Sequence, residues 1–138
     1  MPDLFSGKVK TMRNAARLIV AFQGVVALAV ALALWFAMDG IVFELGILPL
    51  DVTGRATVRA DIAGLFAGIG VMALMAAWQQ SPHWANAVLV LMAAALAGRG
   101  ATIVMDGIGP NTWPPMILEA VSILILSWAR SVWMQTTD

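Results

Sequence analysis

The stretch from Leu18 to Met38 constrains the fold more than any other part of the chain, because Gln23 is its only polar interruption. A helix needs about 20 apolar residues to cross the hydrocarbon core of a bilayer, and this stretch has that length. It is longer than the apolar region of a secretory signal peptide and does not end in an A-x-A cleavage site. We therefore expect it to be retained as a membrane anchor.

Three more apolar segments follow, and we expect four spans in all, at residues 18–38, 58–78, 84–105 and 115–133. Apolar residues make up 61% of the 138 residues, which is more than one soluble domain of this size can bury. The predicted fold class is therefore all-α, an integral membrane antiparallel four-helix bundle in a single transmembrane domain over residues 1–138. Residues 39–57 are expected to form an apolar outer loop that lies in the interface or folds over the mouth of the bundle.

The orientation in the membrane follows from the basic residues, which gather before the first span and at the end of the last. These residues are Lys8, Lys10, Arg13, Arg17 and Arg130. Cytoplasmic flanks of membrane spans carry an excess of Lys and Arg, so both termini are predicted to be cytoplasmic in a bacterial inner membrane. The tryptophans fall near the predicted span ends, as an interfacial aromatic belt requires: Trp35, Trp78, Trp84, Trp113, Trp128 and Trp133.

Composition argues against several functions. The chain has no Cys, which excludes disulfides and thiol catalysis, and with one His and no Tyr it has few side chains for proton transfer. We therefore expect no catalytic residue, no metal site and no cofactor. Formal charge cancels and no basic surface is evident, so nucleic acid is not an expected partner.

Five charged residues lie within or beside the predicted spans, all on the outer side: Arg59, Asp61, Arg99, Asp106 and Glu119. A charge at the bilayer centre costs about 2.5–3.5 kcal/mol on insertion scales, so such groups normally find partners. Glu119 is the expected partner of Arg99, because Gly98 and Gly100 would let a neighbouring helix approach closely. Asp61 and Asp106 are the other candidate partners for the two arginines.

The predicted cluster has two interpretations, and the sequence does not separate them. A polar network within a bundle can fix helix order and register, which is a structural role. An outward-facing polar pocket could instead bind a small amphiphile or relay protons, with Arg99 holding an anionic or carbonyl head group.

Gly64 and Gly68 form a G-x-x-x-G pattern in the second predicted span. Small residues at this spacing allow close packing of membrane helices. We expect this stripe to pack against the first or third helix, with a homodimer contact as the alternative.

Three segments resemble a bacterial family of small four-helix membrane proteins, known only as a domain of unknown function and related to the DoxX-like membrane proteins. They are R-A-D-I-A-G-L-F-A-G-I-G (59–70), G-R-G-A-T-I-V-M-D-G-I-G-P (98–110) and L-E (118–119). Ala63 stands where the family pattern has an aromatic residue. The resemblance implies the fold and four matching polar positions, Arg59, Arg99, Asp106 and Glu119, but no activity.

Together these patterns predict a non-enzymatic integral membrane protein that acts as a binding or accessory subunit of a larger membrane complex. The lipid bilayer and other membrane-protein subunits would then be its partners. The alternative is a small carrier or redox-associated membrane enzyme that uses the Arg99 and Glu119 pair on an amphiphilic ligand such as a quinone or lipid.

Overall fold

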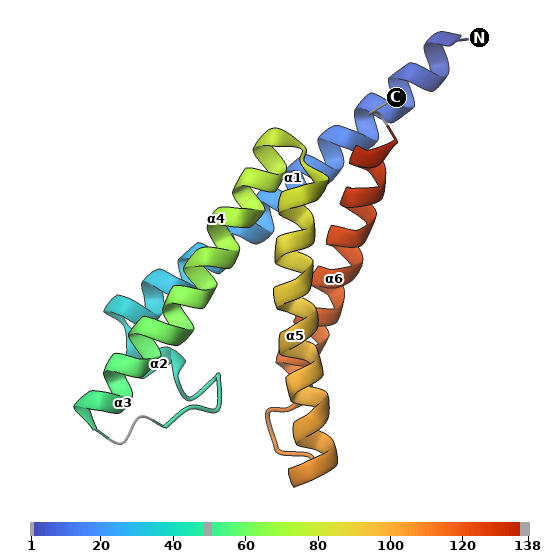
Figure 1. Cartoon of the computed structure of the whole chain (residues 1–138). Helices are drawn as coiled ribbons and strands as arrows, with labels where there is room; N and C mark the ends of the chain where they lie inside the picture. Colours follow the sequence, from blue (N-terminus) through green and yellow to red (C-terminus); the bar gives the residue numbers. More distant parts are fainter. Residues whose placement is uncertain (1, 49–50, 136–138) are drawn as a thin grey trace.

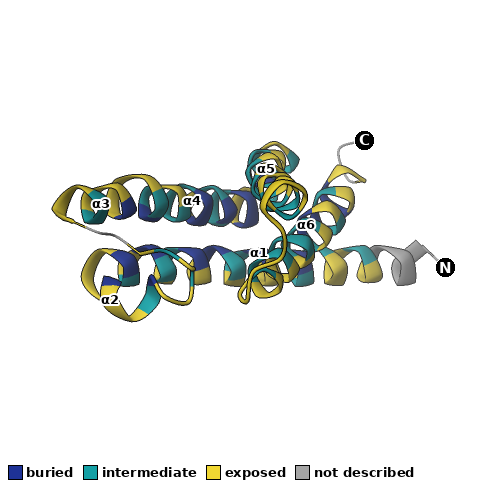
Figure 2. Cartoon of the chain, turned by 90° about the horizontal axis from the view of Figure 1, so that it is seen from below, coloured by how far each residue is buried: buried dark blue, intermediate teal, exposed yellow. Residues whose placement is uncertain are grey.

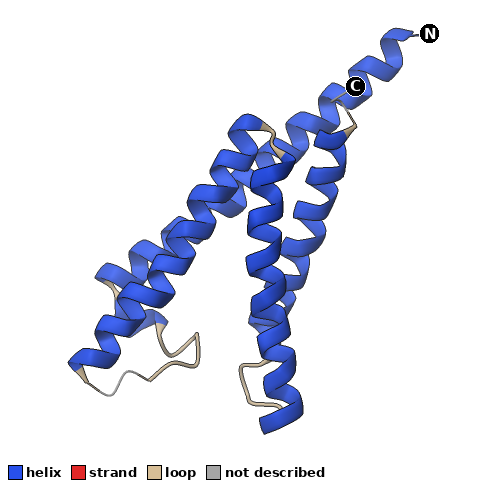
Figure 3. Cartoon of the chain, in the orientation of Figure 1, coloured by secondary structure: helices blue, strands red, loops and turns tan. Residues whose placement is uncertain are grey.

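The computed structural model describes the backbone of residues 2–48 and 51–135, and within these ranges it contains helices and loops but no strand (Figure 3). Four helical segments are long and apolar enough to cross a membrane: Gly7–Phe36, Val52–Gln79, Pro82–Asp106 and Trp113–Met134. The predicted all-helical fold and its four long apolar helices are therefore confirmed. The segments begin or end several residues away from the predicted limits in two places.

Helix α1 (Pro2–Phe36) begins well before the predicted span. The basic N-terminal segment continues the same helix, because nothing between Lys8 and Leu18 breaks it. At 35 residues the helix is about 50 Å long, whereas a bilayer core is about 30 Å thick. Its N-terminal part accordingly extends beyond the other helices (Figure 1).

The predicted loop 39–57 is wrong at both ends, because it contains two short helices. Helix α2 (Met38–Ile41) follows α1 after a kink at Ala37. Helix α3 (Val52–Thr57) is capped by Asp51, whose side chain accepts a hydrogen bond of 2.7 Å from the Gly54 backbone N–H. That cap starts the second apolar segment six residues early, despite the weak helix preference of its Thr and Gly residues.

The second long segment is continuous but not uniform. Helix α3 leads through a π-helical turn, η1 (Val58–Ile62), into helix α4 (Ala63–Gln79). Gln80 ends α4 in the left-handed conformation with φ of 49°, and Pro82 opens helix α5 (Pro82–Asp106). The chain therefore turns sharply, and α5 runs antiparallel to α4 (Figure 1).

Helix α6 (Trp113–Met134) returns beside α5, after a loop that starts at Gly107. The bundle thus consists of two antiparallel helix pairs, α1 with α4 and α5 with α6. We call the end near Gln80 and Met134 the termini end, and the end with α2, α3 and the 107–112 loop the loop end. The two pairs meet at the termini end and diverge toward the loop end (Figure 1).

Burial follows this divergence. The larger core cluster joins all four long helices at the termini end, with members such as Val20, Ala73, Ala85 and Leu126. A second cluster lies at the loop end but involves only the first pair and its apolar connection: Leu34, Met38, Val42, Val58 and Ala63. Buried residues accordingly follow α1 and α4 along their length, whereas the loop ends of α5 and α6 are exposed or intermediate (Figure 2).

Helices α1 and α4 cross most closely at two glycines that the sequence patterns did not single out. A Cβ placed on Gly70 would lie 2.9 Å from the Gly24 carbonyl oxygen, and one on Gly24 would lie 3.0 Å from the Gly70 carbonyl oxygen. A Cβ on Gly64 or Gly68, by contrast, would meet nothing within 4 Å. The expected packing of Gly64 and Gly68 within the chain is therefore wrong. Gly68 and Gly70 are about 200° apart around the helix, so only one can face α1.

Candidate functional site

The polar centre of the second helix pair is an ion pair between Arg99 of α5 and Glu119 of α6. Arg99 Nε donates to Glu119 Oε1 at 2.8 Å, and the two side chains are 40% and 12% exposed. This pair was predicted, and it is confirmed. The pair does not depend on a close helix approach at Gly98 and Gly100, as the sequence had suggested, because a Cβ on either glycine would meet nothing within 4 Å. The long Arg side chain spans the distance without a close approach of the backbones.

Arg99 and Glu119 lie on the same faces of α5 and α6 that form the apolar core nearer the termini end. Arg99 follows Ala85 and Val88, the two buried residues of α5, by about four and three turns. Glu119 precedes the buried Leu126 and Trp133 by about two and four turns. Both charged side chains therefore continue a face that packs against the first helix pair at the termini end, where Trp133 is buried.

The hydrogen-bonding capacity of the pair is only partly used. Glu119 Oε2 is buried and has no hydrogen-bond partner among the described residues. The hydrogen bond from Nε is the one that the Arg99 side chain makes in the described part of the chain. The outer edge of the guanidinium, with its two terminal nitrogens, can accordingly still bind an anionic or carbonyl oxygen.

Arg59 does not pair with a carboxylate, contrary to prediction. Its Nε donates to the Trp35 carbonyl oxygen at 3.3 Å, and Trp35 Nε1 donates to the Arg59 carbonyl oxygen at 3.0 Å. Trp35 lies in the last turn of α1, where carbonyl groups lack helical partners and a cation is favourable. Arg59 therefore fastens the end of α1 to η1, and Trp35 has a specific structural contact besides any interfacial role.

Asp61 and Asp106 are exposed, and neither makes a hydrogen bond or ion pair in the part of the chain that the structure describes. Their predicted pairing with Arg59 and Arg99 is wrong. The divergence of the two helix pairs separates Arg59 from Asp106 and Asp61 from Arg99 (Figure 1). Arg99 and Asp106 share helix α5, but they lie seven residues apart, about 10 Å along its axis. The predicted five-residue cluster thus reduces to the Arg99–Glu119 pair.

A second ion pair, missed by the sequence analysis, joins α3 to α2. Arg55 donates from its two terminal nitrogens to Asp39 Oδ1 at 2.6 Å and Oδ2 at 3.5 Å. This hydrogen bond and the positive charge of Arg55, with a smaller effect of Arg59, lower the pKa of Asp39 below its ordinary value. The pair is exposed at the loop end, where it holds the apolar connection against α3.

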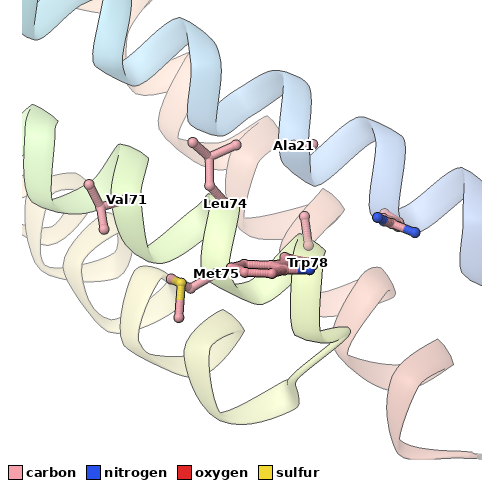
Figure 4. Close-up of a pocket in the computed structure, with 7 residues that line it drawn as sticks. Ala21, Val71, Leu74, Met75 and Trp78 are labelled. Carbon is pink, nitrogen blue, oxygen red and sulfur yellow. The ribbon is translucent and has the colours of Figure 1, made fainter.

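The structure also shows an apolar hollow at the termini end, on the first helix pair. It has a volume of about 410 Å³ and is lined by residues of α1 and α4 that include Arg17, Ala21 and Trp78 (Figure 4). No group of three or more His, Cys, Asp or Glu side chains that could hold a metal ion occurs among the described residues. The polar pair and the hollow are therefore two separate features at opposite ends of the bundle.

No protein-family model, curated protein or solved structure matches this chain. The family resemblance thus stays a prediction.

Proposed function

We propose that the chain is a non-enzymatic integral membrane protein that binds another membrane component, as an accessory subunit of a larger membrane complex. The observation that carries the proposal is the Arg99–Glu119 ion pair, which is partly exposed on a helix pair whose packing is incomplete. Of the 25 residues of α5, only Ala85 and Val88 are buried. Large apolar side chains such as Val104, Met105 and Leu118 remain exposed on this pair.

Exposure to lipid accounts for the apolar side chains but not for the ion pair. Arg99 lies seven residues before the end of α5, about 10 Å along the helix axis. A charge facing hydrocarbon costs up to about 2.5–3.5 kcal/mol, the value at the bilayer centre, so a 40% exposed guanidinium within the span favours a polar or protein neighbour. A helix of another subunit lying between the diverging pairs would supply that neighbour.

The proposal includes a location and an orientation. The Lys and Arg residues at the termini end support a bacterial inner membrane protein with both termini in the cytoplasm. The Arg99–Glu119 pair would then lie in the outer half of the membrane, and the apolar connection between α1 and α3 would lie at its outer surface.

The decisive test is gentle extraction of the native protein, followed by size analysis and mass spectrometry of the proteins that co-purify. We expect a stoichiometric larger complex that Arg99→Gln disrupts and that Arg55→Gln, at the other ion pair, leaves intact. A wild-type chain that runs alone, with no co-purifying protein, would refute the proposal.

A second candidate function has its own supporting observation, the unused hydrogen-bonding capacity of Arg99 and Glu119. A small carrier or redox-associated enzyme could use this pair on an amphiphilic ligand such as a quinone or lipid. In that case the extracted chain runs as a small unit with a bound amphiphile, and Arg99→Ala yields a folded protein without it.

A further inference from the structure

The apolar hollow on the first helix pair has the volume of a small ligand site. Its volume of about 410 Å³ falls within the range of about 300–1,000 Å³ that is typical of such pockets. Val71, Leu74, Met75 and Trp78 of α4 line it on one side, with Ala21 of α1 on the other (Figure 4). Even two turns of a partner helix about 10 Å across would occupy roughly 800 Å³, which is more than the hollow holds. The hollow therefore suits a thinner acyl chain better than a helix.

The mouth of the hollow carries a cation. Arg17 lines it and is exposed, and the structure gives this side chain no hydrogen bond or ion pair among the described residues. Its neighbour one turn earlier is different, because Arg13 Nε donates to Gln80 Oε1 at 2.7 Å. The Arg17 guanidinium is therefore available to an external acceptor.

The surroundings of Arg17 are positive and include an aromatic side chain. Between Gly7 and Phe36 the helix carries four cations and no Asp or Glu. Trp78 lines the same hollow, is 74% exposed and lies next to the end of α4. An exposed indole beside basic residues at a helix end is the arrangement typical of a lipid headgroup region.

We propose that this hollow binds one anionic phospholipid from the leaflet on the side of the chain termini. Arg17 binds the headgroup phosphate through charge-assisted hydrogen bonds, and an acyl chain lies along Leu74, Met75 and Trp78. Lys8 and Lys10 raise the local concentration of anionic lipid without contacting the bound molecule. The inference does not depend on the proposed accessory function, because it concerns the other helix pair and the other end of the bundle.

The test uses the full chain in nanodiscs of equimolar phosphatidylglycerol and phosphatidylcholine. Native mass spectrometry releases the protein from the nanodisc and measures the mass of the lipid that it retains. We expect one retained phosphatidylglycerol per chain in the wild type. Arg17→Gln should retain it about tenfold less, as for the loss of one charge-assisted hydrogen bond. Met75→Trp keeps every charge but narrows the hollow with a larger side chain, and it should also reduce retention of the lipid.

Lys8→Gln is the matched control, because it removes one charge from the same helix outside the hollow. It should retain the lipid as the wild type does. Equal retention of the two lipids by the wild type would overturn the proposal, and so would an equal loss in Lys8→Gln and Arg17→Gln. If Arg17→Gln does not fold, Met75→Trp decides, and unchanged retention there also overturns the proposal.

Discussion

The crossing of α1 and α4 at Gly24 and Gly70 allows a sharp test of how the first helix pair is held together. In Gly70→Ala the new Cβ would lie 2.9 Å from the Gly24 carbonyl oxygen and 2.7 Å from Leu28 Cγ. Contacts of carbon with a carbonyl oxygen normally measure about 3.3–3.6 Å, so the helices must separate by roughly 0.4–0.7 Å. The oxygen belongs to a helical backbone and cannot rotate away, as a flexible side chain could.

Overpacking of this kind typically costs about 1–3 kcal/mol, which is about a 5- to 150-fold change in the unfolding equilibrium. The assay is unfolding of the purified protein in mixed micelles with increasing dodecyl sulfate, followed by circular dichroism. Gly68→Ala is the matched control, because it lies two residues away on the same helix and its Cβ meets nothing within 4 Å. It should be neutral or slightly stabilising, since Ala favours helix more than Gly does.

Equal stability of the Gly70→Ala and Gly68→Ala proteins would refute the reasoning. A loss of stability confined to Gly68→Ala would also do so, because it would place the close contact on the opposite face of α4. That face would then belong to the homodimer that the G-x-x-x-G pattern offers as an alternative.

Three further predictions concern the ion pairs and the orientation. Charge removal in Glu119→Gln, Arg99→Gln and the double variant should reveal a coupling of about 1–2 kcal/mol. This is less than the 3–5 kcal/mol lost when a fully buried pair is broken, because Arg99 is 40% exposed. Because the pKa of Asp39 is lowered in the folded protein, its ionised carboxylate stabilises the fold at pH values above 3.8, the ordinary pKa of an Asp. This contribution should be lost as the pH falls below 3.8, and the Asp39→Asn protein should lack it at every pH. Because the chain has no Cys, single-cysteine variants label cleanly: Asn111→Cys should react with an impermeant maleimide from outside the cell, and Thr11→Cys only after permeabilisation.

Each of these predictions has a contradicting outcome. Additive effects of the two charge removals would mean that Arg99 and Glu119 do not interact. An unchanged acid profile in Asp39→Asn would assign the acid sensitivity to another carboxylate. Labelling of Thr11→Cys in intact cells would reverse the proposed orientation.

The four helices were predictable because apolar length is a local property of the sequence. Their ends were less so, since the start at Val52 depends on an Asp51 cap and a π-helical turn rather than on hydropathy. The Arg99–Glu119 pair was predictable for a related reason. The two residues lie on consecutive antiparallel helices joined by a short loop, at similar distances from that loop.

The rest of the predicted cluster required knowledge of tertiary geometry. Arg59 could meet Asp106, and Asp61 could meet Arg99, only if the two helix pairs stayed together to their loop ends, and no sequence pattern shows that they diverge. The choice of Gly70 over Gly68 likewise depends on which face of α4 turns toward α1. Both α4 faces carry small residues, so composition alone does not distinguish them.

The distribution of polar contacts explains how the bundle could admit a partner. At the loop end, Arg59 joins η1 to α1, Arg55 joins α3 to α2, and Arg99 joins α5 to α6. Each of these contacts lies within one helix pair, and none in the described part of the loop end joins one pair to the other. The shared apolar core lies at the termini end. A helix or lipid entering between the diverging pairs would therefore break none of these contacts, and it would bring a neighbour to the unused edge of the Arg99 guanidinium.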